Sequence, residues 1–87
     1  PMALVYPHAG TAIYIPVELN GRLGRSVFRA VHQRSQAELF WHLDDRFLGK
    51  TRHFHEQAVI AEPGWHTLTL VDDQGFRLHH RFKVLGK

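Results

Sequence analysis

The chain has 87 residues, 44% of them hydrophobic and 22% charged, with a formal net charge of +3. This composition and length are typical of one folded globular domain, which we expect to span residues 1–87. Cysteine is absent, which excludes disulfides, thiolate metal ligands and a cysteine nucleophile, and the scattered basic residues disfavour a nucleic-acid partner.

Alternating apolar and polar residues in the first third of the chain predict β-strands. We expect a short strand over residues 3–6. A second strand is expected over residues 11–19, at an edge or broken at Pro16, because proline cannot donate a ladder hydrogen bond. Residues 20–24 have the composition of a turn. β-branched and aromatic residues favour a strand over a short helix for residues 25–33.

The middle of the chain predicts two further strands. Residues 37–43 alternate strongly, with Trp41 on the apolar face. Residues 44–51 are expected to form a turn, and residues 53–61 a strand.

The last third of the chain predicts a β-hairpin. For Leu68 and Leu70 to share a face with Leu78, opposed residue numbers must sum to an even number. This requires a loop of three or five residues, or a bulge, with Gly75 at positive φ. The expected apolar stripes are His66, Leu68 and Leu70 on one strand and Phe76, Leu78, His80, Phe82 and Val84 on the other.

About seven short strands separated by turns are typical of an all-β fold, which we expect to be an immunoglobulin-like antiparallel β-sandwich. Trp41 would lie in its core, with no disulfide to pack against. Because the chain opens with Pro1, we expect it to be a piece of a larger multidomain protein.

The eight histidines raise the question of a metal site. His53 and His55 are two residues apart, so on one strand they would point the same way and could chelate a metal. No spacing matches a known ligand set, however, and surface or hydrogen-bonded histidines are the favoured interpretation. His66 and His80 fall on apolar stripes and are interpreted as rim or core residues with satisfied hydrogen bonds. We expect no metal and no cofactor.

Patterns of catalytic residues are weak throughout. Residues 48–51 read "LGKT", but a phosphate-binding loop needs a glycine where this chain has Asp44. The adjacent aspartates at 44–45 and 72–73 fall in expected turns. Neither of the two serines has an SxxK or GxSxG context. The sequence therefore predicts no catalytic residues.

A binding surface is the remaining alternative. Tyr6, Tyr14, Phe40, Phe54 and Trp65 could form an exposed platform that stacks on sugar rings, although packing in the core or at edges accounts for most of them. One side of the last strand is basic and must face water. The candidate ligand or partner surface is Tyr14, Trp65, Arg77, His79, Arg81 and Lys83.

The order of these elements resembles the C-terminal domain of bifunctional penicillin-binding proteins of the 1C type. The segments "YPHAGTAIYIP", "LFWHLDDRFLGKT" and "EPGWHTLTLVDDQGFRLHHRFKVL" carry the resemblance, which spans nearly the whole chain. One departure is Asp45, where the family often has a glycine, so the type of that turn stays open. The matching positions are Tyr6, Pro7, Gly10, Pro16, Trp41, Leu48, Gly49, Pro63, Gly64, His66, Leu68, Leu70, Asp72 and Gly75.

The resemblance implies a non-catalytic periplasmic module of an inner-membrane-anchored peptidoglycan glycosyltransferase and transpeptidase. The module would dock on the transpeptidase domain or on a partner protein in cell-wall synthesis. Three alternatives stay open: this docking role, direct binding of peptidoglycan or other carbohydrate, and, as the weakest, nucleic-acid binding. The resemblance supplies no catalytic residues, because the chain has no SxxK, SxN or KTG motif.

Overall fold

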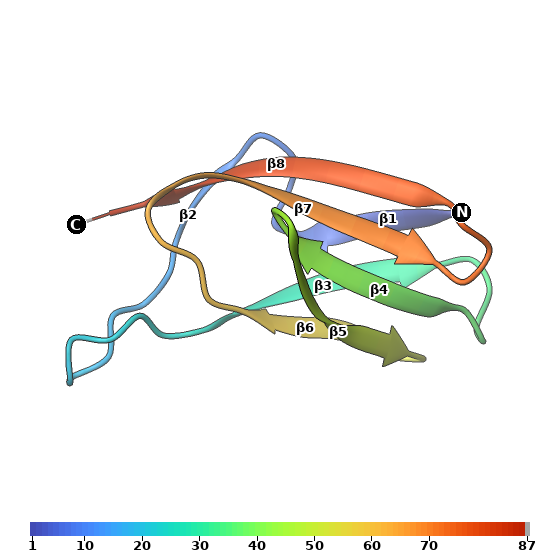
Figure 1. The fold of residues 1–87 in the computed structure, drawn as a ribbon, viewed down its shortest axis with the longest axis horizontal. Helices are drawn as coiled ribbons and strands as arrows, with labels where there is room; N and C mark the ends of the chain where they lie inside the picture. The colour runs from blue at the N-terminus through green and yellow to red at the C-terminus, as the bar shows by residue number, and fades with distance from the viewer. Residues whose placement is uncertain (87) are drawn as a thin grey trace.

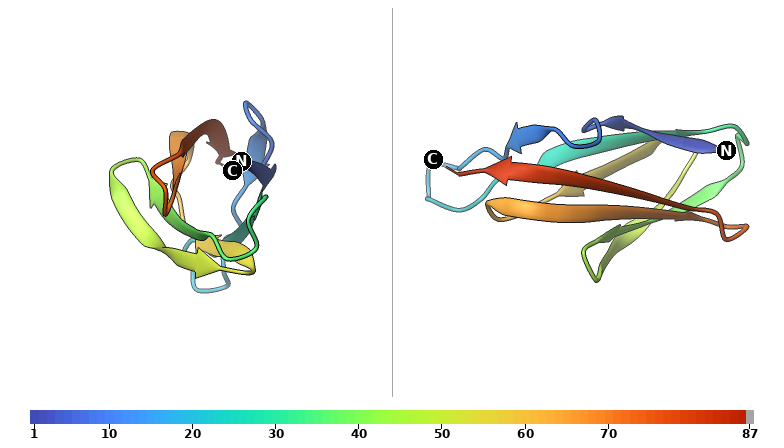
Figure 2. Two further views of the ribbon diagram at one scale, coloured as in Figure 1. Left: turned by 90° about the vertical axis from the view of Figure 1, so that its right-hand side faces the viewer. Right: turned by 90° about the horizontal axis from the view of Figure 1, so that it is seen from above.

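A computed structural model of the protein describes residues 1–86 and contains eight β-strands in two sheets. Figure 1 shows the five-stranded sheet in front of β1 and β3, and the end-on view in Figure 2 shows the strands arranged around a common core. The strands are β1 (Met2–Tyr6), β2 (Ala12–Tyr14), β3 (Ser26–His32), β4 (Glu38–Leu43), β5 (Arg46–Arg52), β6 (His55–Val59), β7 (Gly64–Asp72) and β8 (Arg77–Leu85).

The strand order is β1-β3-β6 in the smaller sheet and β2-β8-β7-β4-β5 in the larger one. Pairing of β4, β7 and β8 in one sheet and of β1, β3 and β6 in the other is the arrangement of an immunoglobulin-like sandwich. The predicted fold class is therefore confirmed. One pair departs from the antiparallel pattern, because β2 runs parallel to β8.

The core lies between the sheets and is built from the inward residues of alternating strands. Trp41 on β4 is fully buried, as predicted, and so are Phe28 on β3 and Phe82 on β8. The Phe28 and Phe82 rings pack edge to face with centroids 5.1 Å apart, a geometry that aromatic pairs favour. Trp41 Nε1 donates a hydrogen bond of 2.8 Å to Thr51 Oγ1, which in turn contacts His55 Nδ1 at 2.8 Å.

The hairpin of β7 and β8 has the predicted register. Leu70 pairs with Leu78 and Val71 with Arg77, so opposed residue numbers sum to an even number. The Asp72 N–H donates to the Phe76 carbonyl at 2.9 Å, which closes a three-residue loop. Gly75 in this loop has φ +89°, as predicted, because an L side chain rarely adopts that conformation.

Pro16 has the expected effect on the second strand. Strand β2 ends at Tyr14, before the proline, and lies at an edge of the larger sheet. Phe76 is a smaller correction: it was placed on the apolar stripe, but it lies before the start of β8 and is 53% exposed.

The prediction of a turn over residues 44–51 is wrong. The turn consists of Asp44 and Asp45 alone, and Arg46–Arg52 form β5, which pairs with β4. In this turn Asp44, rather than Asp45, has positive φ. Within residues 1–86 no helix is long and apolar enough to cross a membrane.

Candidate functional site

The outer face of the larger sheet brings together the six residues predicted as a binding surface. Along β8, every second residue from Arg77 to Lys83 points away from the core, because Phe82 and Val84 between them face inward and are buried. All six side chains are exposed. The residues are Tyr14 on β2, Trp65 on β7, and Arg77, His79, Arg81 and Lys83 on β8. We call this surface the basic face.

Trp65 is the centre of the aromatic part of the basic face. It is 51% exposed and lies directly opposite Lys83. The Arg81 guanidinium lies over its ring, 5.0 Å from the centroid, in a cation–π contact. Tyr14 lies on the other side of β8 and is 65% exposed. His79 is held by a 3.0 Å contact between its Nδ1 and Thr69 Oγ1.

The predicted aromatic platform does not form as a single surface. Tyr14 and Trp65 share the basic face, but Tyr6 lies on β1 of the other sheet and packs against Phe28. Phe54 lies between β5 and β6 and is 86% exposed. Phe40 lies on β4 of the larger sheet but is only partly exposed. The stacking candidates are therefore reduced to Tyr14 and Trp65.

His53 and His55, which could chelate a metal if they lay on one strand, do not lie on one strand. His53 has φ 67° and precedes β6, so it does not share a strand direction with His55. His55 is buried, and burial together with the nearby His32 and His53 lowers its pKa. Among the described residues no group of three or more potential ligands could hold a metal ion.

The predicted hydrogen bonding of the two apolar-stripe histidines holds for one of them. His66 contacts Asp44 and the Glu62 carbonyl. Nδ1 of His80, however, has no partner although it is buried. Burial lowers the pKa of His80.

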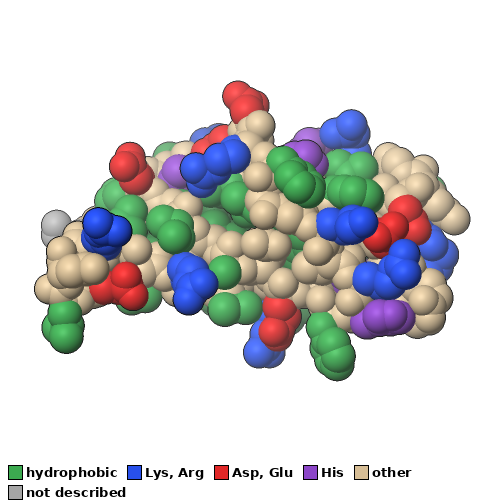
Figure 3. Space-filling model, turned by 60° about the horizontal axis from the view of Figure 1, so that its bottom comes forward, with side chains coloured by type: hydrophobic (Ala, Val, Ile, Leu, Met, Phe, Trp, Pro, Cys, Tyr) green, Lys and Arg blue, Asp and Glu red, His purple; other side chains and the backbone are tan. Residues whose placement is uncertain are grey.

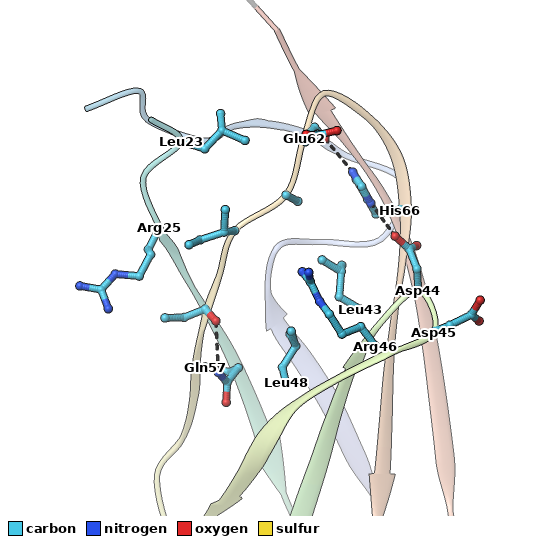
Figure 4. Close-up of a pocket in the computed structure, with 13 residues that line it drawn as sticks. Leu23, Arg25, Leu43, Asp44, Asp45, Arg46, Leu48, Gln57, Glu62 and His66 are labelled. Atoms are coloured by element: carbon cyan, nitrogen blue, oxygen red, sulfur yellow. Dashed lines mark hydrogen bonds and ion pairs between the residues drawn. The ribbon is translucent and has the colours of Figure 1, made fainter. Parts of the chain in front are cut away.

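A groove opens where the two sheets separate, between β5 and the connection from β6 to β7 (Figure 4). Its volume is about 960 Å³. Gln57 lines the lower part of the groove in Figure 4, and its Oε1 lies so near Gly49 of β5 that an added Cβ would meet it at 2.9 Å. The apolar lining of the groove is Leu23, Leu43, Leu48, Ile60 and Ala61.

The charged residues of the groove are mixed in sign. Arg25, Arg46, Asp44, Asp45 and Glu62 all line it. Figure 4 shows the Arg46 side chain directed toward the middle of the groove and those of Arg25 and Asp45 directed away from it. The side of the molecule seen in Figure 3 likewise shows apolar side chains among charges of both signs. The groove therefore has no single charge preference.

His66 is anchored at the groove by two acceptors. Its Nδ1 lies 2.8 Å from an Asp44 carboxylate oxygen and its Nε2 lies 2.7 Å from the Glu62 carbonyl. Burial alone would lower the pKa of His66, but these hydrogen bonds and charges outweigh it and raise the pKa above its ordinary value. Its ring also stacks on Phe82. These contacts hold the His66 ring in place, so we interpret His66 as a structural residue of the groove wall.

A third surface was not predicted: the outer face of the smaller sheet carries exposed valines around a single ion pair. Val5, Val27 and Val31 are 44%, 49% and 54% exposed. Ala3 lies opposite Val31, and Ala58 lies opposite Val27. One ion pair crosses this surface, from Arg29 Nε to Glu56 Oε2 at 2.8 Å. We call it the valine face.

The signal for the valine face was present in the sequence. In "SVFRAVH" apolar residues occupy both faces of one strand, since Phe28 and Ala30 point inward and Val27 and Val31 outward. A strand with one wet face is normally polar on that face. The groove had no comparable signal, because its walls come from segments far apart in the sequence.

Two sheets of three and five strands, with a basic face on one and a valine face on the other, define the class of a small β-sandwich module. Comparison with known families matches residues 1–82 to the Penicillin-Binding Protein C-terminus Family. The chain belongs to this family, the C-terminal domain of bifunctional penicillin-binding proteins; the 1C type stays a prediction. No curated protein and no solved structure matches the chain.

Proposed function

We propose that this chain is a non-catalytic docking module of a peptidoglycan synthase, and that it docks on the transpeptidase domain of the same protein. A partner protein of cell-wall synthesis is the second candidate for the docking surface. Membership of the penicillin-binding protein C-terminus family supports the assignment to a synthase. It also supports a periplasmic location for the module, as part of a protein anchored in the inner membrane.

The valine face is the observation that carries the docking role. Three valines on adjacent strands are each 44–54% exposed, with alanines directly opposite two of them. Exposed apolar side chains grouped on one face of a sheet are typical of a contact with another protein. The Arg29–Glu56 ion pair at its centre would give such a contact orientation as well as area.

The non-catalytic role is supported by the residues available for chemistry. The chain has no SxxK, SxN or KTG motif, and Lys50-Thr51 is followed by Arg52. Thr51 itself is engaged with Trp41 and His55 in the core, so its hydroxyl has a structural role. The chemistry of a synthase would then be carried out by its other domains.

Site-specific photo-crosslinking in the intact synthase tests the docking role. A photoreactive residue at Val31, on the valine face, is expected to crosslink to the transpeptidase domain. The same residue at Arg77, on the opposite sheet, is the matched control and is expected not to crosslink there. Adding Val27→Lys should abolish the crosslink from position 31, because it places a charge in the contact.

Each outcome separates the candidates. A crosslink from position 31 to a separate cell-wall synthesis protein would move the docking surface to that partner. Absence of any crosslink specific to position 31, in a synthase whose domain is folded, would contradict docking through the valine face.

A further inference from the structure

The basic face presents basic side chains in a regular row. Successive outward residues of a strand are about 7 Å apart, twice the rise per residue. Arg77, His79, Arg81 and Lys83 occupy four consecutive outward positions of β8. Such a row matches a ligand that carries its negative charges along an extended chain.

The cations of this row are free to act on a ligand. Within residues 1–86, Arg77, Arg81 and Lys83 take part in none of the ion pairs, whose basic members lie elsewhere. Across the sheet, Glu38 is already held by Lys50 at 3.2 Å and Arg52 at 3.4 Å. The row therefore keeps its positive charge.

The aromatic residues add a second kind of contact. The Arg81 guanidinium covers one side of the Trp65 ring and fixes its orientation. With 51% of Trp65 exposed, the ring keeps surface for a planar or ring-shaped ligand group. Tyr14, 65% exposed, flanks the row on the other side of β8. Rings and negative charges together are the features of an acidic glycan.

We infer that the basic face binds peptidoglycan. Trp65 would stack on a sugar ring of the glycan while Arg81, Lys83 and Arg77 contact the carboxylates of the peptides attached along it. The inference rests on the proposed function for its choice of polymer, since single-stranded nucleic acid also combines rings with charge. It uses a different sheet from the valine face, so either surface can fail alone.

Co-sedimentation of the 87-residue chain with purified peptidoglycan sacculi, at low and at physiological salt, tests this inference. We expect retention at both, weaker at physiological salt because screening reduces the charge contribution. Trp65→Ala should weaken retention by about tenfold, as loss of one stacking aromatic does. Phe54→Ala is the matched control, since Phe54 is 86% exposed but lies off the basic face.

A second variant keeps the test independent of Trp65 packing. Arg77→Glu with Lys83→Glu, which leaves Arg81 over the Trp65 ring, should abolish retention. Arg22→Glu with Arg25→Glu, which changes the net charge equally, should not. Thermal unfolding of each variant checks that it is folded.

Three results would overturn the inference: no retention of the unmodified chain at either salt, equal losses in both charge-reversal pairs, or tighter binding to single-stranded DNA or anionic lipid vesicles than to sacculi. The docking crosslink at position 31 does not depend on these results.

Discussion

His32 Nε2 donates a hydrogen bond of 2.9 Å to Asp72 Oδ2, and both side chains are fully shielded from solvent. The backbone N–H of Arg34 donates to His32 Nδ1, so Nδ1 is an acceptor and the ring proton of the neutral imidazole lies on Nε2. Asp72 Oδ1 accepts from the Gln74 and Phe76 N–H groups at 2.9 Å each. One carboxylate therefore joins the end of β3 in one sheet to the β7–β8 loop of the other.

Asp72→Ala is expected to lower the free energy of unfolding by about 3 kcal/mol, because it leaves buried donors without an acceptor. That is a large share of the roughly 4–13 kcal/mol expected for a chain of this size. Urea unfolding measures the loss. Asp73→Ala is the control: Asp73 pairs with Arg34 near the surface, and its loss should stay below about 1 kcal/mol. Equal losses of stability in the two variants would contradict the role of Asp72 in joining the two sheets.

The Asp44–His66 contact predicts a change of stability with pH. Because the pKa of His66 is raised in the folded state, its contribution is complete below the ordinary value of 6.5 and is lost as pH rises through the raised value. Burial alone would raise the pKa of Asp44, but its bonds to His66 and Thr67 lower it. The pair therefore also weakens in acid, as pH falls through the lowered pKa of Asp44.

NMR titration of His66 measures this contribution directly. We expect a pKa above 6.5 in the unmodified chain and a lower one in Asp44→Asn, which keeps an acceptor for the Thr67 N–H but removes the charge. Asp44 is half exposed, so Asp44→Asn should cost only about 0.5–1 kcal/mol near pH 6. An unchanged His66 pKa in Asp44→Asn would rule out the proposed cause.

His80→Leu is expected to stabilise the protein. His80 faces inward opposite Leu68, and its buried Nδ1 has no hydrogen-bond partner. Replacing it removes a penalty of about 1 kcal/mol. Burial lowers the pKa of His80, so protonation destabilises the fold as pH falls below 6.5, and the gain should grow toward acid. Thermal unfolding measures the stability of His80→Leu, with His79→Leu as an outward-facing control. No rise in unfolding temperature for His80→Leu would contradict the prediction.

The local alternation of the sequence was sufficient for most strands and for the hairpin register. Leu68, Leu70 and Leu78 could share a face in only one family of registers, and the structure has that register. The basic row from Arg77 to Lys83 followed from the same alternation. Pattern alone thus located the part of the basic face on β7 and β8, because these two strands are adjacent in the chain.

Strand β5 was missed because its own pattern is irregular. A bulge shifts the register between Trp41 and His42, so the pairs change from Trp41–Gly49 to His42–Phe47. Gly49 and the charged residues around it have weak strand propensity. The strand forms because β4 lies beside it with Leu39 and Trp41 in the core, which is information the segment itself does not contain.

Contacts between distant segments were also beyond the reach of local pattern. His32 and Asp72 are separated by 40 positions. The groove combines residues from the segment before β3, the β4–β5 turn and the β6–β7 connection. Neither alternation nor turn composition specifies which distant segments meet. The His32–Asp72 contact and the groove could therefore be found only in the structure.

The parallel pairing of β2 with β8 has a consequence for how the chain is made. Ala12 pairs with Lys83 and Tyr14 with Leu85, near opposite ends of the sequence. During synthesis from the N-terminus, β2 leaves the ribosome well before β8, because paired residues of the two strands are 71 positions apart (83 − 12). Completion of the larger sheet must therefore wait until β8 has been made, and contacts of such long sequence separation form slowly.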